Sequence, residues 1–570
     1  MGRQGKVVPL ISRMKLNPSL RFCLCGLLFW IGTAMQGAMP APALVVVISV
    51  DQLRADYLER FREHFGPGGF TLLLEQGANF TDCHYRHSVT KTAPGYAVML
   101  TGVHADLNGI FGNDWLDRGS FERVSSVGDP SEQIVGLPPS SAPRLPGIDD
   151  PYLGRSPRKL LVATVGDELK KARAGHPKVI GISEKDRAAI LMSGKQADAA
   201  YFMERGLMIS STYYLKVLPA WVNAWNAAGK SVACFGKVWD RVLPAADYAV
   251  QGPDDAPGED DQTDQLGRTF PKTVNGGEKT PGPKFYDAFE TSPFSNEVLE
   301  DFAEATIVNE NLGGRAGITD LLCLSFSAND HIGHFYGPDS HEIMDNVVRM
   351  DRTLAGFFKF LDQRIGLKNC TIVLTADHGV SPMPETIHAR NPAIPAGRLD
   401  TALIQRTVEA ALNKTFGPLA DKSQWSVRDD AWFLLYPAAL QEKKVEAAAA
   451  QSVMRAALLT LDFIQAAYTR DQLEKREVND EFGQSALLSF NRVRSGDVFF
   501  QPRPYFYNKV AGSTHGTPYD YDNHVPLLWY GVGVKPGVRT ERVGMDDLAP
   551  TLAHILGIPA PPLAAGRILF

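Results

Sequence analysis

Cysteine is scarce in this chain, with 6 among 570 residues. Cys23 and Cys25 lie near the N-terminus, and no two cysteines form a C-x-x-C pair, which argues against a zinc knuckle. Two of the remaining cysteines sit in apolar runs typical of strands, so buried free thiols and disulfides both stay open. The remaining cysteines are Cys83, Cys234, Cys323 and Cys370.

An excess of positive charge is also missing. The chain has 58 lysines and arginines against 64 acidic residues, a formal net charge of -6. Because a dedicated nucleic-acid binder is usually basic, we expect no nucleic-acid binding surface. An anionic substrate must instead be held by local cations. The hydrophobic share of 44% excludes a largely disordered protein, and the length allows several domains or one large α/β body.

Long hydrophobic runs are absent except near the N-terminus. There, residues 22–35 form an apolar run after a basic leader without acids, and small residues follow up to position 43. The run is shorter than the ~20 residues that span a bilayer, so residues 1–43 are predicted to be a signal peptide. We therefore expect export to the bacterial periplasm or the medium, with no membrane span after cleavage. An uncleaved membrane anchor is the alternative.

Short apolar runs recur along the rest of the chain, and they are typical of parallel strands buried on both faces. Helical patterns alternate with them, as in residues 340–362 and 545–556. This alternation predicts an α/β fold with a doubly wound, mostly parallel central sheet and helices on both faces. The predicted strands cover residues 44–50, 178–182, 320–327, 370–374 and 525–530.

Two regions rich in proline and glycine, residues 129–158 and 251–284, break this rhythm and are predicted to be surface excursions, and a longer stretch follows them. Residues 384–506 carry helical patterns of their own, over 401–413 and 440–461. We therefore expect one catalytic domain over residues 44–570, with inserted cap segments around 115–300 and 384–506.

Polar side chains that can bind metals stand where the predicted strands end. In open α/β sheets, ligands bind beyond the carboxyl ends of the strands. Carboxylates and imidazoles gathered there suit Zn²⁺ or a similar divalent ion, and six are about what two ions need. Each of them alone could instead be a helix cap or a chance motif. The candidates are Asp51, Asp330, His334, Asp377, His378 and His515.

A candidate nucleophile lies in the segment SVTKTAPGY, which offers the hydroxyls of Ser88, Thr90 and Thr92. Thr92 precedes an apolar helical run, so it can be an ordinary helix N-cap. It can equally be a nucleophile, because a metal can deprotonate a hydroxyl and the positive end of a helix favours a phosphate oxygen. The residues alone leave both interpretations open.

Several short motifs follow one another in a fixed order: TKTAPGY, GIFGNDW, ISEKDRAAI, SANDHIGHFYGP, TADHG and GSTHGTPYD. Together they resemble the alkaline phosphatase superfamily, and most closely its PafA-type bacterial alkaline phosphatases, which are similar to type I phosphodiesterases and nucleotide pyrophosphatases. The resemblance covers nearly all of the chain after residue 43. It implies hydrolysis of small-molecule phosphate monoesters through a covalent phospho-threonine, with two Zn²⁺ ions as cofactors.

The resemblance also implies a role for each matching residue. Thr92 matches the nucleophile, which also sits on one zinc ion. The other ligands of that ion match Asp51, Asp377 and His378, and the ligands of the second ion match Asp330, His334 and His515. The side chains that bind the phosphoryl oxygens match Asn113, Lys185 and Arg187. Tyr96 departs from the pattern, since relatives often have His there, but this is not a ligand position.

The pair Lys185 and Arg187 favours a monoesterase, because two cations can bind the extra charged oxygen of a monoester dianion. Phosphodiesterases and nucleotide pyrophosphatases of the superfamily generally lack the pair, so diesterase activity is the alternative. A sulfatase would need a C/S-x-P-x-R motif, which TKTAPGY does not provide. A further alternative is a protein without enzymatic activity, namely a catalytically silent metal-binding envelope protein. The presence of the full set of ligands argues against it.

Overall fold

The computed structural model describes residues 1–2, 41–138, 150–260 and 265–570, and it places the predicted apolar strands in the middle of one large sheet. Five neighbouring strands run parallel there, and the central three have every side chain buried. The predicted α/β sheet with a parallel centre is thus confirmed, within a sheet that is mixed as a whole. In spatial order the five are β13 (Cys370–Thr375), β1 (Leu44–Val50), β12 (Asp320–Phe326), β7 (Val179–Ser183) and β8 (Ala199–Glu204).

Antiparallel strands extend this centre on both sides. The predicted strand at 525–530 is present as β20 (His524–Gly531), but it pairs antiparallel with β13. Beyond it, β2 (Ala78–His84) runs antiparallel to β20 with a bulge between Phe80 and Cys83. On the far side, β9 (Leu207–Ser211) returns antiparallel to β8. The sheet ends are completed by β21 (Gly537–Arg539), β22 (Val543–Gly544), β5 (Gly128–Val135) and β6 (Leu153–Arg155).

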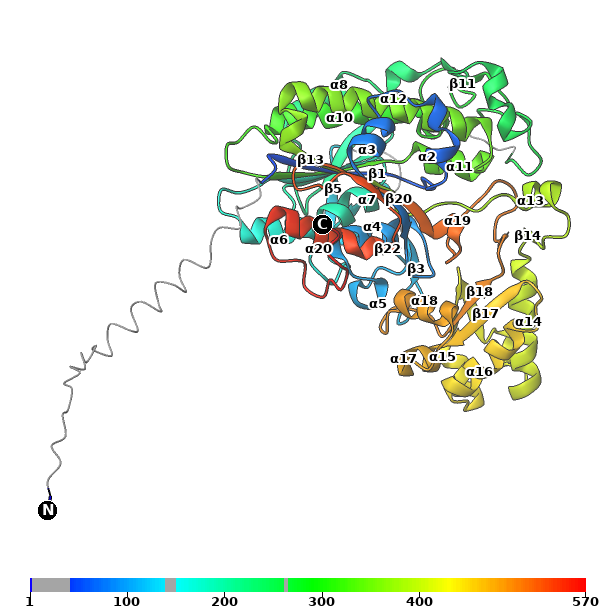
Figure 1. Ribbon diagram of the computed structural model, residues 1–570. Helices are drawn as coiled ribbons and strands as arrows, with labels where there is room; N and C mark the ends of the chain where they lie inside the picture. The colour runs from blue at the N-terminus through cyan, green and yellow to red at the C-terminus, as the bar shows by residue number, and fades with distance from the viewer. Residues whose placement is uncertain (3–40, 139–149, 261–264) are drawn as a thin grey trace. The chain divides into compact units, whose positions relative to one another are not determined.

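Helices cover both faces of the sheet (Figure 1). On one face, α12 (His341–Arg364) packs beside α10 (Pro293–Glu310). The helix predicted over 340–362 is therefore confirmed, and the hydroxyl of Ser340 caps it by accepting from the amide of Ile343. The opposite face carries α4 (Thr92–Thr101), α7 (Asp186–Ser193) and α20 (Leu548–Leu556). The helix predicted from residue 545 begins with one 3₁₀ turn, Met545–Asp547, before α20.

Residues 384–506 contain a smaller antiparallel sheet with its own core. A separate cluster of buried side chains, including Ile404, Trp425 and Phe433, fills the space between this sheet and its helices. The single helix predicted over 440–461 is wrong, because Lys444 adopts a left-handed conformation with φ 53° and splits it in two. The elements are α14 (Thr401–Phe416), α15 (Pro437–Lys443), α16 (Ala447–Leu458), β15 (Ser426–Asp429), β16 (Trp432–Leu435), β17 (Ile464–Thr469), α17 (Arg470–Lys475), α18 (Glu481–Ser489) and β18 (Val498–Pro502).

The structure also bears on the predicted signal peptide, the predicted insertions and the cysteines. The predicted signal peptide falls almost wholly outside the described residues. Within 115–300, the strands β7, β8 and β9 belong to the central sheet, so any insertion in that range is interrupted by core elements. The four cysteines in the described part of the chain are buried free thiols. Among the described residues, no helix combines the length and apolar character needed to cross a membrane.

Candidate active site

The six predicted ligands come together beyond the carboxyl ends of the parallel strands. Asp51 follows β1, Asp377 and His378 follow β13, and α11 (Ala328–Tyr336) begins directly after β12. They form two groups of three, and within each group one ligand atom per residue lies within 4.8 Å of the others. The first group is Asp51, Asp377 and His378, and the second is Asp330, His334 and His515.

The first group is completely buried. Nε2 of His378 lies 3.5 Å from Oδ1 of Asp51 and 3.3 Å from Oδ2 of Asp377. Neither of these two carboxylate oxygens has a hydrogen-bond partner. Buried carboxylate oxygens left unpaired are costly unless a cation meets them.

The second group gathers around one carboxylate oxygen. Oδ1 of Asp330 lies 3.3 Å from Nε2 of His334 and 3.6 Å from Nε2 of His515. His334 stands four residues after Asp330 on α11, so the helical repeat places both side chains on one face. His515 also stacks on His378 with ring centroids 3.5 Å apart, which brings the two groups into contact.

All three histidines are held in the same tautomer. Nδ1 of His378 lies 2.9 Å from the carbonyl oxygen of Gly379. Nδ1 of His334 lies 2.9 Å from the carbonyl oxygen of Ser513, and Nδ1 of His515 lies 2.8 Å from that of Thr90. A carbonyl oxygen can only accept, so Nδ1 carries the proton and Nε2 presents a lone pair to the carboxylates. This arrangement is the one in which imidazoles bind metals.

Burial shapes the charge of these groups. It lowers the pKa of His378 to about 4 and that of His515 well below its usual range, so both imidazoles stay neutral. It raises the pKa of Asp51, and it raises that of Asp377 well above its usual range, with the neighbouring carboxylate of Asp51 adding to the effect. Because these carboxyl groups are buried and close together, a nearby positive charge is needed to stabilise their ionised form.

Lys185 supplies one such charge. Its ammonium nitrogen lies 2.8 Å from Oδ2 of Asp51 and also contacts Oδ2 of Asp330, so one cation bridges the two groups. Burial would raise the pKa of Asp330, but its interactions with His334 and with the ammonium group of Lys185 outweigh burial and lower that pKa well below its usual range. Lys185 immediately precedes α7, and the loop between β7 and this helix aims it into the site.

Thr92 is the first residue of α4 and its hydroxyl does not cap the helix. Its Oγ1 lies 3.5 Å from Nε2 of His378, at the edge of the first group. The hydroxyl of Thr90, by contrast, donates to the carbonyl oxygen of Thr517 at 2.8 Å. Gly95 lets α4 approach closely, because a Cβ there would lie 2.3 Å from the carbonyl oxygen of Asp377.

Asn113 contacts the start of α4, and Arg187 lies near the first group. Oδ1 of Asn113 accepts from the backbone amide of Ala93 at 2.8 Å, which leaves its amide NH₂ group beside the helix start. Arg187, two residues after Lys185, has a buried Nε with no hydrogen-bond partner and is close enough to lower the pKa of Asp51. The hydroxyl of Tyr96 pairs with Oγ of Ser325 at 2.6 Å.

Gln52 is a site residue that the sequence reasoning missed. Its side-chain amide donates to Oδ1 of Asp330 at 2.5 Å, and its backbone amide donates to Oδ1 of Asp377 at 3.2 Å. It therefore links the two groups, and it does so from a left-handed conformation with φ 65°. Gly333 makes room for it, because a Cβ at that position would lie 1.8 Å from Oε1 of Gln52.

The donor set fits two divalent metal ions. Each group offers carboxylate oxygens and imidazole nitrogens, which suit zinc, and leaves positions open for a substrate. The orphaned oxygens of Asp51 and Asp377 and the oriented Nε2 lone pairs are the observations that carry this fit.

Several known proteins are similar to this chain in sequence and in fold. A model of the type I phosphodiesterase / nucleotide pyrophosphatase family matches residues 45–504. Alkaline phosphatase PhoV of Synechococcus elongatus is 33% identical over 531 residues, which cover 93% of this chain and 92% of the relative. Alkaline phosphatase PafA of Elizabethkingia meningoseptica is 31% identical over 548 residues, with 94% and 95% covered.

The solved structure of PafA is similar with a TM-score of 0.85 at 30% identity, covering 94% of this chain and 99% of that one. The structure of a PafA variant in which a threonine, an asparagine, a lysine and an arginine are substituted gives the same TM-score at 29% identity, with the same coverage. These matches confirm the predicted fold class.

Proposed function

Because the chain belongs to the type I phosphodiesterase / nucleotide pyrophosphatase family and is an alkaline phosphatase of the PafA type within it, we propose that it hydrolyses phosphate monoesters through Thr92 at a two-zinc site. The observation that carries the proposal is the position of the Thr92 hydroxyl beside the first group, with the second group in contact through His378 and His515. The four residue types substituted in the PafA variant are those of Thr92, Asn113, Lys185 and Arg187.

Thr92 attacks phosphorus in line with the leaving group. The new bond joins Oγ1 to phosphorus, the ester P–O bond breaks, and the alcohol departs. Water then hydrolyses the phospho-threonine, releasing inorganic phosphate and restoring the hydroxyl. Zinc ions, bound by the two groups, would supply Lewis acidity at the attacking and leaving oxygens.

Protein side chains meet the charge on the other phosphoryl oxygens. Asn113 is fixed by the amide of Ala93, so its NH₂ group is oriented before substrate arrives. Lys185 and Arg187 bring two positive charges close to Asp51 of the first group, which Thr92 borders. A monoester dianion has an extra anionic oxygen for such a pair, whereas a diester carries a second ester group in its place. The pair is therefore the feature that favours monoesters.

Phosphodiester or nucleotide pyrophosphate hydrolysis is the second candidate, because the matching family model carries that description. Turnover of p-nitrophenyl phosphate and bis-p-nitrophenyl phosphate by zinc-loaded protein decides between the two. We expect the monoester to have the higher kcat/KM and EDTA to abolish both activities. A higher kcat/KM for the diester would reverse the assignment, and EDTA-resistant turnover would contradict the metal site.

We further propose that residues 384–506 act as a cap over this site in an exported enzyme. Lys91, which immediately precedes Thr92, pairs with the carboxylate of Asp430 from that segment. The segment thereby reaches the residue next to the nucleophile, where it can shape the entry for the ester's leaving group. Export rests on the leader at residues 1–43.

A further inference from the structure

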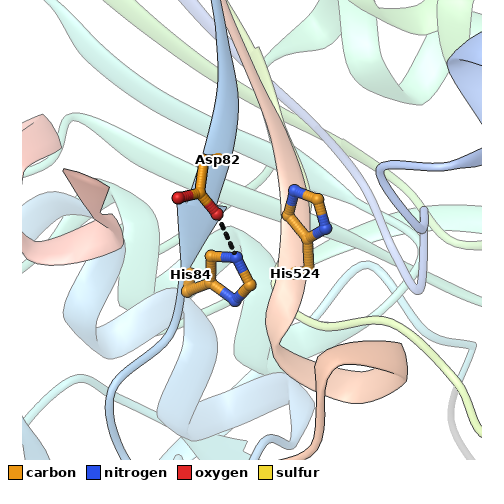
Figure 2. Close-up of side chains that lie close together, drawn as sticks. All are labelled: Asp82, His84 and His524. Atoms are coloured by element: carbon orange, nitrogen blue, oxygen red, sulfur yellow. Dashed lines mark hydrogen bonds and ion pairs between the residues drawn. The ribbon is translucent and has the colours of Figure 1, made fainter. Parts of the chain in front are cut away.

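One more group of side chains, outside the candidate active site, has the composition of a metal site. Asp82 and His84 lie on β2, and His524 is directly opposite His84 on the antiparallel strand β20. One ligand atom from each lies within 4.8 Å of the others. Figure 2 shows the carboxylate and the two imidazoles gathered between the two strands. We name these three residues the strand-end group.

His84 presents a lone pair to Asp82. Its Nδ1 lies 2.8 Å from Oδ1 of Asn523, whose amide nitrogen donates to the carbonyl oxygen of Pro518 at 2.6 Å. That second bond fixes which way the amide points, so Nδ1 of His84 must carry the proton. Nε2 then faces Oδ1 of Asp82 at 2.7 Å. Two acceptors this close need a cation that both can bind.

A second proton on His84 could be that cation, but the surroundings disfavour an imidazolium. The side chain is 4% exposed, and its ring stacks on that of His524 with centroids 4.3 Å apart. Arg542 lies 3.8 Å from the same oxygen of Asp82, and the exposed carboxylate of Asp520 lies 3.8 Å from Nδ1 of His84.

We propose that the strand-end group binds a third divalent metal ion of the zinc class. One carboxylate and two imidazoles suit zinc, and three protein ligands leave a position for water. For His524 to ligate through Nε2, the metal replaces its 2.9 Å hydrogen bond to the carbonyl oxygen of Thr81, its proton moves to Nδ1, and its ring turns out of the stack on His84. A cavity of about 700 Å³, lined in part by Asp520, Asn523 and Arg542, opens beside the group and gives the ion access.

The histidines of the candidate active site are arranged in the same way. Nδ1 of each is hydrogen-bonded to a carbonyl oxygen, and Nε2 faces carboxylates. In the strand-end group, the amide oxygen of Asn523 takes the place of that carbonyl for His84. A second-layer acceptor of this kind orients an imidazole and makes Nε2 a better ligand.

The ion would join the ends of two strands, β2 and β20, each of which adjoins a segment that carries a residue of the candidate active site. β2 leads into the segment that carries Thr92, and β20 follows the segment that carries His515. The two segments are already bonded, since Thr90 donates to the carbonyl oxygen of Thr517 and accepts from Nδ1 of His515. A metal joining the strand ends therefore has a structural role, and its binding does not depend on the proposed reaction.

Zinc content tests the proposal. The full-length protein and its variants are stripped with EDTA, reloaded with zinc, desalted and analysed by mass spectrometry. We expect Asp82→Asn and His524→Gln each to hold one zinc equivalent per chain less than the control His388→Gln, whose histidine is exposed on α13 (Pro384–Arg390). Asp520→Asn, which removes a nearby carboxylate outside the group, should keep the full content.

Equal zinc content in Asp82→Asn, His524→Gln and the control would overturn the proposal and leave a hydrogen-bonded Asp82–His84 pair. Crystals of the unsubstituted, zinc-loaded protein give a check that needs no variant. An anomalous peak at the zinc edge between Asp82, His84 and His524 supports the site, and its absence beside occupied catalytic positions refutes it. Loss of phosphatase activity in Asp51→Asn, with the strand-end zinc retained, would separate this site from the catalytic one.

Discussion

The hydroxyl oxygen of Thr92 lies 3.5 Å from Nε2 of His378, and this nitrogen also faces the carboxylates of Asp51 and Asp377. The imidazole is neutral because burial lowers its pKa to about 4, and its Nδ1 proton is held by the carbonyl oxygen of Gly379. Thr92 therefore borders a buried set of oxygen and nitrogen donors, and its hydroxyl contacts the imidazole of His378. A metal ion bound by that set would lie next to the threonine oxygen.

Thr92→Ala should reduce turnover of p-nitrophenyl phosphate by at least about 10³-fold, because it removes the oxygen that forms the covalent intermediate. Zinc content and melting temperature should stay near those of the unsubstituted protein, since the Thr92 hydroxyl does not cap α4. Steady-state kinetics and metal analysis check this.

Thr90→Ala is the matched control for that substitution. The Thr90 hydroxyl donates to the carbonyl oxygen of Thr517, so its loss should lower stability by about 1 kcal/mol and leave the chemistry largely intact. If Thr90→Ala or Ser88→Ala proves as damaging as Thr92→Ala, the nucleophile is misassigned.

Substituting Lys185 and Arg187 together by alanine should lower monoester turnover far more than diester turnover. The reason is that two cations bind the additional anionic oxygen of the monoester. Each lost charged contact in the transition state is worth about 2–3 kcal/mol, so we expect a monoester loss near 10³-fold. The kcat/KM values of both p-nitrophenyl substrates, measured at saturating zinc, give the comparison. Equal losses for both would mean that the pair does not recognise the dianion.

The sequence predicted the strands that build the site and the residues at their ends, because buried parallel strands and the polar residues after them leave a local pattern. It did not predict how those residues are held. Gln52 was missed because its role comes from a left-handed turn and from Asp330, far along the chain. The acceptors that fix the histidine tautomers are backbone carbonyl oxygens, which every residue has. The amino-acid sequence therefore does not indicate which carbonyl oxygens accept these hydrogen bonds.

The misjudged helix over 440–461 has a similar cause. Its residues favour helix throughout, and only the tertiary context places Lys444 in a left-handed conformation. The strand-end group also went unrecognised, because His84 and His524 are separated by most of the chain and meet only through strand pairing.

Gly95→Ala should impair catalysis without removing any reacting group. A Cβ at this position would lie 2.3 Å from the carbonyl oxygen of Asp377 and 2.9 Å from its Cβ, so α4 and the end of β13 must separate. The shift moves Thr92 away from the first group, and a displacement of about 1 Å can cost about 10²-fold in rate. We expect kcat to fall by roughly that factor with zinc still bound.

A matched substitution on the same helix is Ala97→Gly, which lowers helix propensity by about 1 kcal/mol without adding bulk. If it reduces kcat as much as Gly95→Ala does, helix stability and not the close approach to Asp377 is responsible.

Glu300 on α10 provides a pH-dependent test of the fold that is independent of the metal sites. Its pKa is raised to about 8, first by burial and then by the like charges of Glu304, Glu297 and Asp301 on the same helix. The folded protein therefore keeps this carboxyl protonated at pH values where the unfolded chain, with a pKa near the ordinary value of 4.5, has lost the proton. Stability from this group is highest at low pH and falls as the pH rises from about 4.5 to about 8.

Glu300→Gln removes that dependence, because glutamine is neutral in both states. The variant should match the unsubstituted protein near pH 4 and exceed it at pH 8 by about 1 kcal/mol, a value reduced for the partial exposure of the side chain. Denaturant unfolding at both pH values, with zinc held constant, measures the difference. The control is Glu297→Gln, which removes the same charge from an exposed position of α10. An equal gain in that variant would assign the effect to the net charge of the helix, and a gain confined to Glu300→Gln assigns it to burial of the carboxyl against α12.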